Sequence, residues 1–351
     1  MGRLQIRAVF GSLSSGDRRK DLTYEQESTE YWENQSAMTP SLDPLSDLIH
    51  TYSIAARDPE SGQMGVAVQS HYFSVGPMCP WAEAGVGAVA TQSFVDPGYG
   101  PLGLDLMRTG KSAEETLRGL LAADELEHRR QVAMIDSKGG VAAHTGASCI
   151  AEAGHRTGDG FSVQANMMLN NTVWDAMAET FVSTPGSLAQ RMLAALVAAE
   201  TEGGDIRGRQ SAAMLIVNGE STGKPWTDRF LELRVEDHTQ PLDEMQRLLT
   251  IHGSYARARE ISARIYQGAD LEAALADVLA MQAEGATNLE LDFWFAVSLI
   301  AAGKDSEAKK TLDKVFEIDP NWAELLRRLP AADLLEIEDS RLELFAPTGS
   351  T

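Results

Sequence analysis

Thr51 is the residue of this chain whose type and position best suit a nucleophile. It begins an apolar run that ends at Arg57, and a second alternating run ends at Ser70 after an Asp-Pro-Glu-Ser-Gly turn. Pro and Gly favour turns, and Ile and Val favour strands, so the pattern predicts a β-hairpin. If the bond between His50 and Thr51 is cut, Thr51 gains a free α-amine beside its hydroxyl. That amine has a pKa of roughly 7.7–8.0 and can accept the hydroxyl proton near neutral pH. A strand threonine is also a common structural residue, and the hairpin alone does not separate the two readings.

Four polar residues near predicted strand ends are candidates for binding a substrate beside Thr51. Ser53 lies two residues further on, and alternation along a strand places both side chains on one face. Ser53 could bond the Thr51 amine or be an ordinary strand serine. Arg57 could tune that amine or simply close the turn. Thr91 and Gln92 end a third apolar run, where they could rim a pocket or make edge hydrogen bonds.

Acyl transfer also needs hydrogen-bond donors where negative charge develops on the carbonyl oxygen. Asn166 follows a predicted strand, and its side-chain amide is our candidate donor; capping of nearby backbone is the alternative. His144 stands at another strand end, where it could line the pocket or serve a structural role.

The loop Gly203–Gly208 presents opposite charges at Asp205 and Arg207. Its two leading glycines free the backbone after a predicted helix. One charge could hold a substrate amine and the other a carboxylate through charge-assisted hydrogen bonds. Alternatively, the two side chains pair with each other and fix the loop.

Several segments, in order, resemble the family called domain of unknown function 1028. They are Thr51–Asp58, Gly65–Ser70, Gly85–Gln92, Asp96–Gly100, Arg130–Val132, His144–Gly146, Gln164–Met167 and Gly203–Ala213. The resemblance covers roughly residues 51–235. It implies the fold of the N-terminal-nucleophile (Ntn) hydrolases, a four-layer αββα sandwich, and it favours a site role for Asp205 and Arg207. In this family the threonine usually follows the initiator methionine closely, whereas here 50 residues precede it.

The hydropathy pattern places these residues in an α+β fold. Predicted strands cover residues 51–57, 63–71, 85–92, 130–136, 140–145, 161–166, 211–218 and 229–235. Predicted helices between them cover residues 102–109, 112–123, 172–181 and 187–202. Residues 1–50 are polar and predict a tail or pro-segment, or a start placed too far upstream.

After Pro241 the pattern becomes helical, over 242–265, 269–283, 288–302, 305–317 and 321–328. Residues 289–322 resemble one tetratricopeptide unit, with small residues at Ala296, Gly303 and Ala308 and a helix stop at Pro320. The expected division is therefore a tail over 1–50, an Ntn-hydrolase-like domain over 51–238 and a helical extension over 239–351.

Composition narrows the possible partners. The net charge of −21 argues against nucleic acids and anionic membranes, which require basic patches. Cys79 and Cys149 are the two cysteines, and with no Cys-x-x-Cys they predict neither a disulfide framework nor a metal site. No apolar run has the roughly 18–20 residues of a membrane span. We expect a cytoplasmic protein that forms a homo-oligomer and uses no cofactor.

The sequence thus predicts an amidohydrolase that cleaves an amide bond of a small molecule or short peptide. Thr51, exposed by cleavage after His50, is the predicted nucleophile and Asn166 a predicted catalytic partner. Two alternatives remain open at this point. One is a non-catalytic module on the same fold that binds a ligand or partner while the tail stays attached. The other is a scaffold protein whose C-terminal helices recruit a partner.

Overall fold

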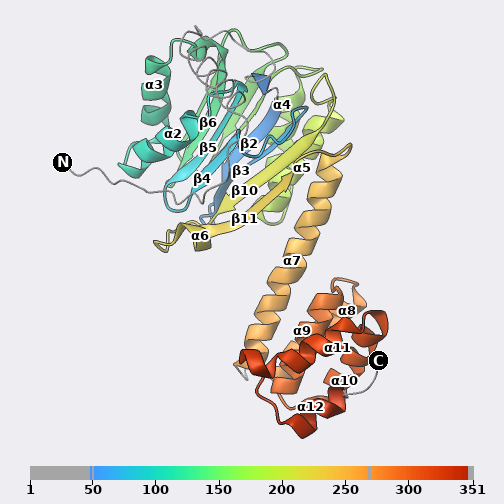
Figure 1. The fold of residues 1–351 in the computed structure, drawn as a ribbon. Helices are drawn as coiled ribbons and strands as arrows, with labels where there is room; N and C mark the ends of the chain where they lie inside the picture. Colours follow the sequence, from blue (N-terminus) through green and yellow to red (C-terminus); the bar gives the residue numbers. More distant parts are fainter. Residues whose placement is uncertain (1–47, 50, 268–269, 347–351) are drawn as a thin grey trace, which may run out of the picture. The chain divides into compact units, whose positions relative to one another are not determined.

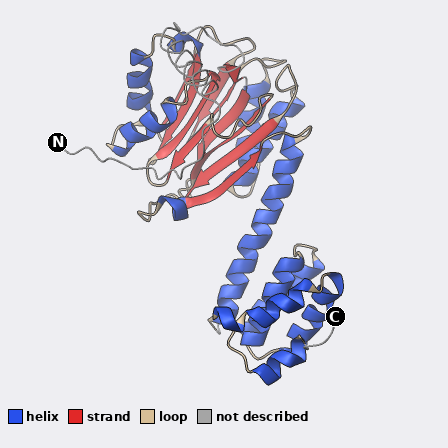
Figure 2. Ribbon diagram, in the orientation of Figure 1, coloured by secondary structure: helices blue, strands red, loops and turns tan. Residues whose placement is uncertain are grey.

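The computed structural model describes residues 48–49, 51–267 and 270–346. Two antiparallel β-sheets and their helices occupy residues 48–235, which we call the two-sheet region (Figure 1). Helices make up the C-terminal part of the chain, as the colouring in Figure 2 shows. The predicted mixed α+β architecture with a helical C-terminal region is confirmed. The predicted tail lies outside the described residues, apart from residues 48 and 49.

A six-stranded sheet contains the predicted hairpin. Its strands are β2 (Thr51–Arg57), β3 (Met64–Ser70), β8 (Gly154–Gly158), β9 (Phe161–Ala165), β10 (Ser211–Val217) and β11 (Arg229–Val235). They are arranged in the order β11-β10-β3-β2-β9-β8, with every neighbouring pair antiparallel. Within the hairpin, Thr51 stands opposite Ser70.

A five-stranded sheet lies against the first. Its strands are β1 (Leu48–Ile49), β4 (Pro80–Glu83), β5 (Gly87–Phe94), β6 (Arg130–Asp136) and β7 (Val141–Thr145). The central strands run in the order β5-β6-β7, and one edge of β5 carries two short strands. β4 pairs with residues 87–90 and β1 pairs with Ser93 and Phe94.

Alternation along the strands decides which side chains meet between the sheets. In β2, Tyr52 and Ile54 belong to the apolar core under the helices, whereas Ala55 belongs to the core between the sheets. Thr51 and Ser53 share the face of Ala55. The polar residues at the start of β2 therefore point toward the second sheet.

Helices cover the outer faces of the two sheets (Figure 1). α2 (Tyr99–Arg108) and α3 (Ala113–Ala123) pack on the five-stranded sheet, while α4 (Val173–Ser183) and α5 (Leu188–Thr201) pack on the six-stranded sheet. A capping box formed by a serine and the residue three positions later begins both α3 and α5. Two short helices complete this region, η1 (Glu127–Arg129) and α6 (Pro225–Asp228).

The C-terminal region is helical throughout its described length. It comprises α7 (Pro241–Tyr266), α8 (Leu271–Ala283), α9 (Leu289–Ala301), α10 (Asp305–Ile318), α11 (Asn321–Arg328), η2 (Pro330–Ala332) and α12 (Asp339–Phe345). Ala296 and Ala308 are fully buried between α9 and α10, and Gly303 has a φ of 74° in the turn that joins them. None of the helices that the structure describes is long and apolar enough to cross a membrane.

Candidate active site

Thr51 lies at the start of β2 with no solvent exposure. Its hydroxyl oxygen is 3.0 Å from the backbone carbonyl oxygen of Ile49 and 3.2 Å from the hydroxyl oxygen of Ser70. The strand pairing explains the second contact, because Ser70 is the residue opposite Thr51 on β3. In the uncut chain, the Thr51 hydroxyl therefore lies in a closed, polar position between the two sheets.

The backbone of Thr51 is held by three donors on its carbonyl oxygen. The backbone N–H of Asn166 lies 3.1 Å away, its side-chain Nδ2 3.4 Å away, and the Nε2 of Gln92 3.2 Å away. Asn166 follows β9, which pairs with β2, and Gln92 comes from β5 of the opposite sheet. Both sheets thus fix the position of the predicted nucleophile.

Gln131 connects the two amide side chains that contact Thr51. Its Oε1 accepts hydrogen bonds from Gln92 Nε2 at 2.7 Å and from Asn166 Nδ2 at 2.9 Å. Its Nε2 lies 2.9 Å from Thr145 Oγ1, and it also lies within hydrogen-bonding distance of two backbone carbonyl oxygens of the β8–β9 hairpin. Gln131 is fully buried, so these partners satisfy an amide that would otherwise be costly to bury.

A second branch of this network runs along the face of β2. Ser53 donates to Gln92 Oε1 at 2.6 Å and accepts from Gln164 Nε2 at 2.5 Å. Ser162 donates in turn to Gln164 Oε1 at 2.8 Å. All of these side chains are fully buried. We refer to Thr51, Ser53, Ser70, Gln92, Gln131, Ser162, Gln164 and Asn166 as the inter-sheet polar network.

Asp205 and Arg207 pair with each other next to the end of β3. Arg207 Nη2 lies 2.7 Å from Asp205 Oδ2, and Arg207 also donates its backbone N–H and Nε to Asp205 Oδ1. Asp205 Oδ2 further accepts the backbone N–H of His71, the residue after Ser70, at 3.2 Å. The Asp205 side chain is fully buried, whereas that of Arg207 is 30% exposed. The pair therefore fixes the loop and leaves the arginine within reach of solvent.

Three predicted binding residues are not brought to Thr51. Arg57 stands at the other end of β2, about 20 Å away at roughly 3.3 Å per residue. Thr91 alternates with Gln92 and so faces the other side of its sheet, where its hydroxyl donates to the carbonyl oxygen of Asp96. His144 likewise alternates with Thr145, and its Nε2 lies 2.9 Å from the backbone carbonyl oxygen of Glu127.

The inter-sheet network includes residues that sequence reasoning did not select, notably Ser70, Gln131 and Gln164. Each of them belongs to a segment that resembles the family, and each is an uncharged polar residue of a strand whose residues are mostly apolar. A polar residue among apolar neighbours in a strand is the sequence feature that could have identified these three positions. Which strands lie opposite one another depends on contacts between distant parts of the chain, so the sequence did not bring these three residues together.

The two cysteines have the wrong ionisation state for nucleophiles. Burial raises the pKa of the Cys79 thiol to about 12, and burial also raises the pKa of Cys149. A thiol attacks as its thiolate, which both sites disfavour. Among the described residues, no group of three or more His, Cys, Asp and Glu side chains is arranged to hold a metal ion.

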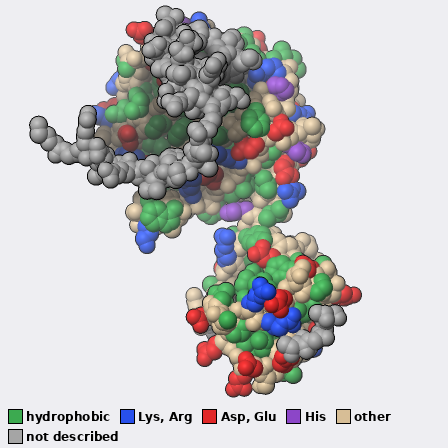
Figure 3. Space-filling view, in the orientation of Figure 1, with side chains coloured by type: hydrophobic (Ala, Val, Ile, Leu, Met, Phe, Trp, Pro, Cys, Tyr) green, Lys and Arg blue, Asp and Glu red, His purple; other side chains and the backbone are tan. Residues whose placement is uncertain are grey.

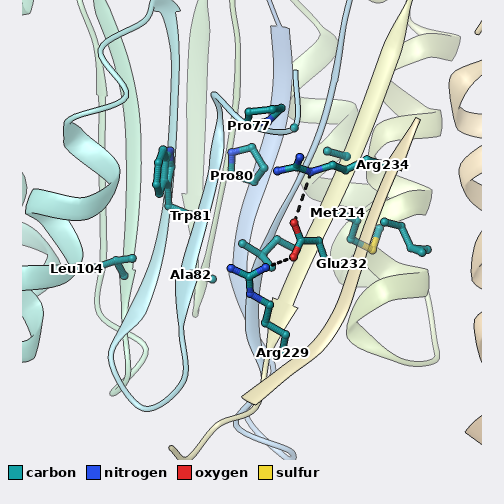
Figure 4. A pocket seen from close by; sticks show the side chains of 13 residues that line it. Pro77, Pro80, Trp81, Ala82, Leu104, Met214, Arg229, Glu232 and Arg234 are labelled. Carbon is teal, nitrogen blue, oxygen red and sulfur yellow. Dashed lines mark hydrogen bonds and ion pairs between the residues drawn. The ribbon is translucent and has the colours of Figure 1, made fainter. Parts of the chain in front are cut away.

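A separate cavity of about 230 Å³ opens at the edge of the two sheets, between β4 and β11 (Figure 4). Trp81 and Pro80 form one wall, and Glu232 lies between Arg229 and Arg234 on the other. Both arginines are paired with this one carboxylate, so one positive charge of the three lining groups is left uncompensated. On the face of the molecule drawn in Figure 3, acidic and basic side chains of the described residues are interspersed.

Comparison with known proteins identifies the family. The profile of the family described as "Family of unknown function (DUF1028)" matches residues 51–245. The crystal structure of protein SPO2555 from Silicibacter pomeroyi, assigned to DUF1028, resembles this chain with 30% sequence identity and a TM-score of 0.51. The similarity covers 57% of this chain and 88% of that one. No curated protein matches this chain. Because the profile matches more than half of its residues, the chain belongs to the DUF1028 family of unknown function.

Proposed function

We propose that this protein is an N-terminal-nucleophile amidohydrolase with Thr51 as its nucleophile. The observation that carries the proposal is the placement of the Thr51 hydroxyl, 3.2 Å from Ser70 Oγ in a buried polar network that draws donors from both sheets. A structural threonine needs one or two hydrogen bonds, whereas this one is also held through its carbonyl oxygen by Gln92 and Asn166. Such preorganisation is what a nucleophile requires.

The chemistry follows from a free amine at Thr51. After cleavage, the α-amine takes the hydroxyl proton while the oxygen attacks the substrate carbonyl carbon. The C–N bond then breaks, and the departing amine receives that proton. Water hydrolyses the resulting ester and frees Thr51. Asn166 Nδ2 is our candidate donor to the oxygen that becomes negative in each tetrahedral intermediate.

Exposure of that amine requires cleavage between His50 and Thr51. The Thr51 hydroxyl would attack the carbonyl carbon of His50, an N-to-O acyl shift, and water would hydrolyse the ester. Two observations support this. The family profile begins to match at Thr51 itself, and helices lie on both outer faces of the paired sheets, the layer order of the Ntn hydrolases.

The proposed substrate is a small molecule or short peptide with an amide bond. Asp205 and Arg207 lie next to the Thr51–Ser70 pair, so the exposed side of Arg207 is a candidate contact for a substrate carboxylate. We further propose a cytoplasmic homo-oligomer in which the C-terminal helices, which resemble a tetratricopeptide unit, serve packing or assembly.

A binding role without catalysis is the second candidate, favoured by one observation. Thr51 is completely buried in the uncut chain, and its nitrogen there is an amide without a basic lone pair. If the chain stays uncut in the cell, the protein cannot use Thr51 as an Ntn nucleophile. It would then serve as a ligand- or partner-binding module.

Intact-mass spectrometry of freshly purified protein, combined with a library of amide substrates, tests the proposal. We expect wild type to lose residues 1–50 and to hydrolyse an amide. Thr51→Ala should stay full length and inactive, and Thr51→Ser should process slowly. Thr116→Ala is the matched control, because Thr116 is a buried threonine of α3 whose hydroxyl has no hydrogen-bond partner in the described structure. Hydrolysis at full rate by an uncut chain would overturn the mechanism, and an uncut, inactive wild type would favour the binding module.

A further inference from the structure

The residues that precede Thr51 are held by the sheet opposite to the one in which Thr51 lies. Leu48 and Ile49 form β1, which pairs antiparallel with Ser93 and Phe94 of β5 in the five-stranded sheet. Thr51 begins β2 of the six-stranded sheet. The chain therefore passes from one sheet to the other between Ile49 and Thr51, where the proposed self-cleavage takes place.

Ile49 is anchored in the folded core. Its side chain has no solvent exposure and belongs to the apolar cluster between the sheets, together with Ala55, Cys79 and Ala90. Its backbone carbonyl oxygen lies 3.0 Å from the Thr51 hydroxyl oxygen. The segment before the scissile bond thus presents three features that a ligand could reproduce beside the nucleophile. They are an extended backbone, a branched apolar side chain and a carbonyl oxygen.

The part of β5 beside Ile49 has an unusual backbone. Ser93, the residue opposite Ile49, has a φ of 71°, which residues other than glycine rarely adopt. The preceding residue, Gln92, donates to the Thr51 carbonyl oxygen. Backbone strain of this kind is concentrated at sites that bind ligands or perform chemistry. The edge that holds Ile49 is therefore both strained and directly connected to the proposed nucleophile.

Cleavage after His50 would leave β1 attached to the protein by non-covalent contacts alone. Its departure would uncover the edge of β5 at Ser93 and Phe94, because β4 pairs with residues 87–90 of the same strand. It would also empty the space that Ile49 fills. An uncovered strand edge binds an extended peptide through main-chain hydrogen bonds, while spaces for alternate side chains give specificity. An apolar space favours an apolar side chain.

We propose that the place held by β1 becomes the acyl-side subsite of the processed enzyme. Its substrates are then short peptide amides with a branched apolar residue immediately before the residue whose carbonyl carbon is attacked. This inference rests on the proposed function. In self-cleavage, the acyl group that forms the ester with the Thr51 oxygen comes from His50, and the C–N bond to Thr51 breaks.

In turnover, the acyl residue of the substrate takes the place of His50, and the residue before it takes the place of Ile49. The substrate's own amide C–N bond breaks, the leaving amine takes a proton, and water later releases the peptide acid from Thr51. A charged side chain at the position of Ile49 would enter an apolar cluster, so the subsite should reject it.

Fluorogenic peptide amides test the proposal on the chain that self-cleavage leaves, residues 51–351. The probes are acetyl-Leu-Ile-His, acetyl-Leu-Ala-His and acetyl-Leu-Asp-His, each joined through an amide bond to aminomethylcoumarin. We expect kcat/KM to be at least about tenfold higher for the Ile peptide than for the Ala peptide, and lowest for the Asp peptide. Acetyl-Leu-Ile-His with a free carboxyl group should inhibit competitively, and its Asp counterpart should inhibit at least about tenfold more weakly.

Ile49→Ala in the full-length chain is an independent test, because the same place holds this residue before self-cleavage. We expect self-cleavage, followed by intact-mass spectrometry, to slow by about tenfold or more. The processed chain is identical to that of wild type, so its turnover should be unchanged. Ile216→Ala is the matched control, because Ile216 is a fully buried residue of β10 in the other apolar core, under the helices. It should lower the thermal midpoint and slow self-cleavage much less.

The outcomes distinguish this inference from the proposed function. A wild-type chain that stays uncut, or that is cut and hydrolyses no amide, refutes the proposed function and this inference with it. A processed chain that hydrolyses amides but treats the Ile, Ala and Asp peptides alike refutes this inference only. Equal slowing of self-cleavage by Ile49→Ala and Ile216→Ala also counts against the subsite, and the peptide series decides if Ile216→Ala does not fold.

Discussion

Gln92 and Gln131 stand directly opposite each other on β5 and β6, and Gln92 donates a 2.7 Å hydrogen bond to the Gln131 carbonyl oxygen. Both side chains point across to the six-stranded sheet, where each reaches a backbone carbonyl oxygen of that sheet. Amide groups therefore join the two sheets near Thr51, at the start of β2. Apolar side chains such as Ala55 and Val66 fill the rest of the space between the sheets. The geometry of Thr51 depends on this amide pair.

Two buried glutamines should respond in opposite ways to loss of their amides. Gln131→Leu leaves several buried partners unpaired, and we expect the free energy of unfolding to fall by about 2 kcal/mol or more. Gln69 is as buried, but neither atom of its amide has a partner in the described structure. Gln69→Leu should therefore leave stability unchanged or raise it. Urea denaturation measures both, and equal losses would contradict the assigned network.

Substitutions at Gly87 of β5, with Gly119 of α3 as the control position, test the packing of β5. A Cβ atom at Gly87 would lie 2.5 Å from the carbonyl oxygen of Ile135 and 2.8 Å from Met107 Cε. Gly87→Ala should lower the free energy of unfolding by about 1–3 kcal/mol, and Gly87→Val by more. Gly119 in α3 has no heavy atom within 4 Å of that position, so Gly119→Ala should stabilise the protein by about 0.5–1 kcal/mol. Thermal melts of the variants decide, and a Gly87→Val midpoint equal to wild type would show that the strand is not packed as described.

Asp205 and Arg207 should be energetically coupled. Asp205→Ala removes the acceptor of the His71 backbone N–H, and Arg207→Ala leaves a buried carboxylate without its cation. Each single variant should lose stability, and the double variant should lose less than the sum, by about 0.5–3 kcal/mol. A double-mutant cycle by chemical denaturation measures this. If Arg207 also contacts substrate, Arg207→Ala should reduce turnover by more than the loss of folded protein explains. If both single variants keep the stability of wild type, the pair does not fix the loop.

The Asp124–Arg130 pair predicts a stability loss in acid. Burial alone would raise the pKa of Asp124, but the hydrogen bond from Arg130 at 2.7 Å, the backbone N–H of Leu126 and the Arg130 charge outweigh it and lower that pKa. A carboxyl group with a lowered folded-state pKa stabilises the fold above its unfolded-state pKa of about 3.9, and this stabilisation is lost as pH falls through the lower, folded-state value. Asp124→Asn should therefore be less stable than wild type at pH 7, by about 1–3 kcal/mol. The gap should begin to narrow as the pH falls below about 3.9 and should close as the pH passes the lower, folded-state pKa. A constant gap from pH 7 to pH 2.5 in denaturation curves would rule out this linkage.

Cys79 should be inert in the folded protein. Because burial raises the pKa of its thiol to about 12, the thiol stays protonated at pH 8. Iodoacetamide should leave Cys79 unmodified in native protein and alkylate it after denaturation, as mass spectrometry of the peptides would show. If amide hydrolysis is found, Cys79→Ala should retain it. Rapid native labelling with loss of activity would point to the thiol instead of Thr51.

The strands that sequence predicted best are those with strong local patterns. The strand predicted over residues 51–57 has the same bounds in the structure, and the one over 63–71 differs by one residue at each end. Neither β4 nor β8 is among the strands predicted from the hydropathy pattern. Both are short edge strands: β4 begins with Pro80, and β8 is polar, with its central residues exposed. Their pairing with β5 and β9 defines them, and local composition does not reveal it.

The candidate site was predictable only as far as local alternation allows. Thr51 and Ser53 were placed on one face of a strand, and the structure puts them there together. The same rule separates Thr91 from Gln92, since adjacent strand residues point to opposite faces. In the structure, Gln92 therefore contacts Thr51, whereas the Thr91 hydroxyl bonds the carbonyl oxygen of Asp96. The role of Gln131 could not be predicted in this way, because it depends on which strand pairs with β5. That pairing joins residues about 40 positions apart in the sequence.

The first turns of α7 decide where this chain can be divided. Leu242 and Met245 are part of the apolar core beneath the six-stranded sheet, and Leu248 and Leu249 pack against it. A polypeptide that stopped at residue 238 would uncover that core and present an apolar patch prone to self-association. A fragment intended for expression of the two-sheet region alone should therefore keep the chain through Leu249.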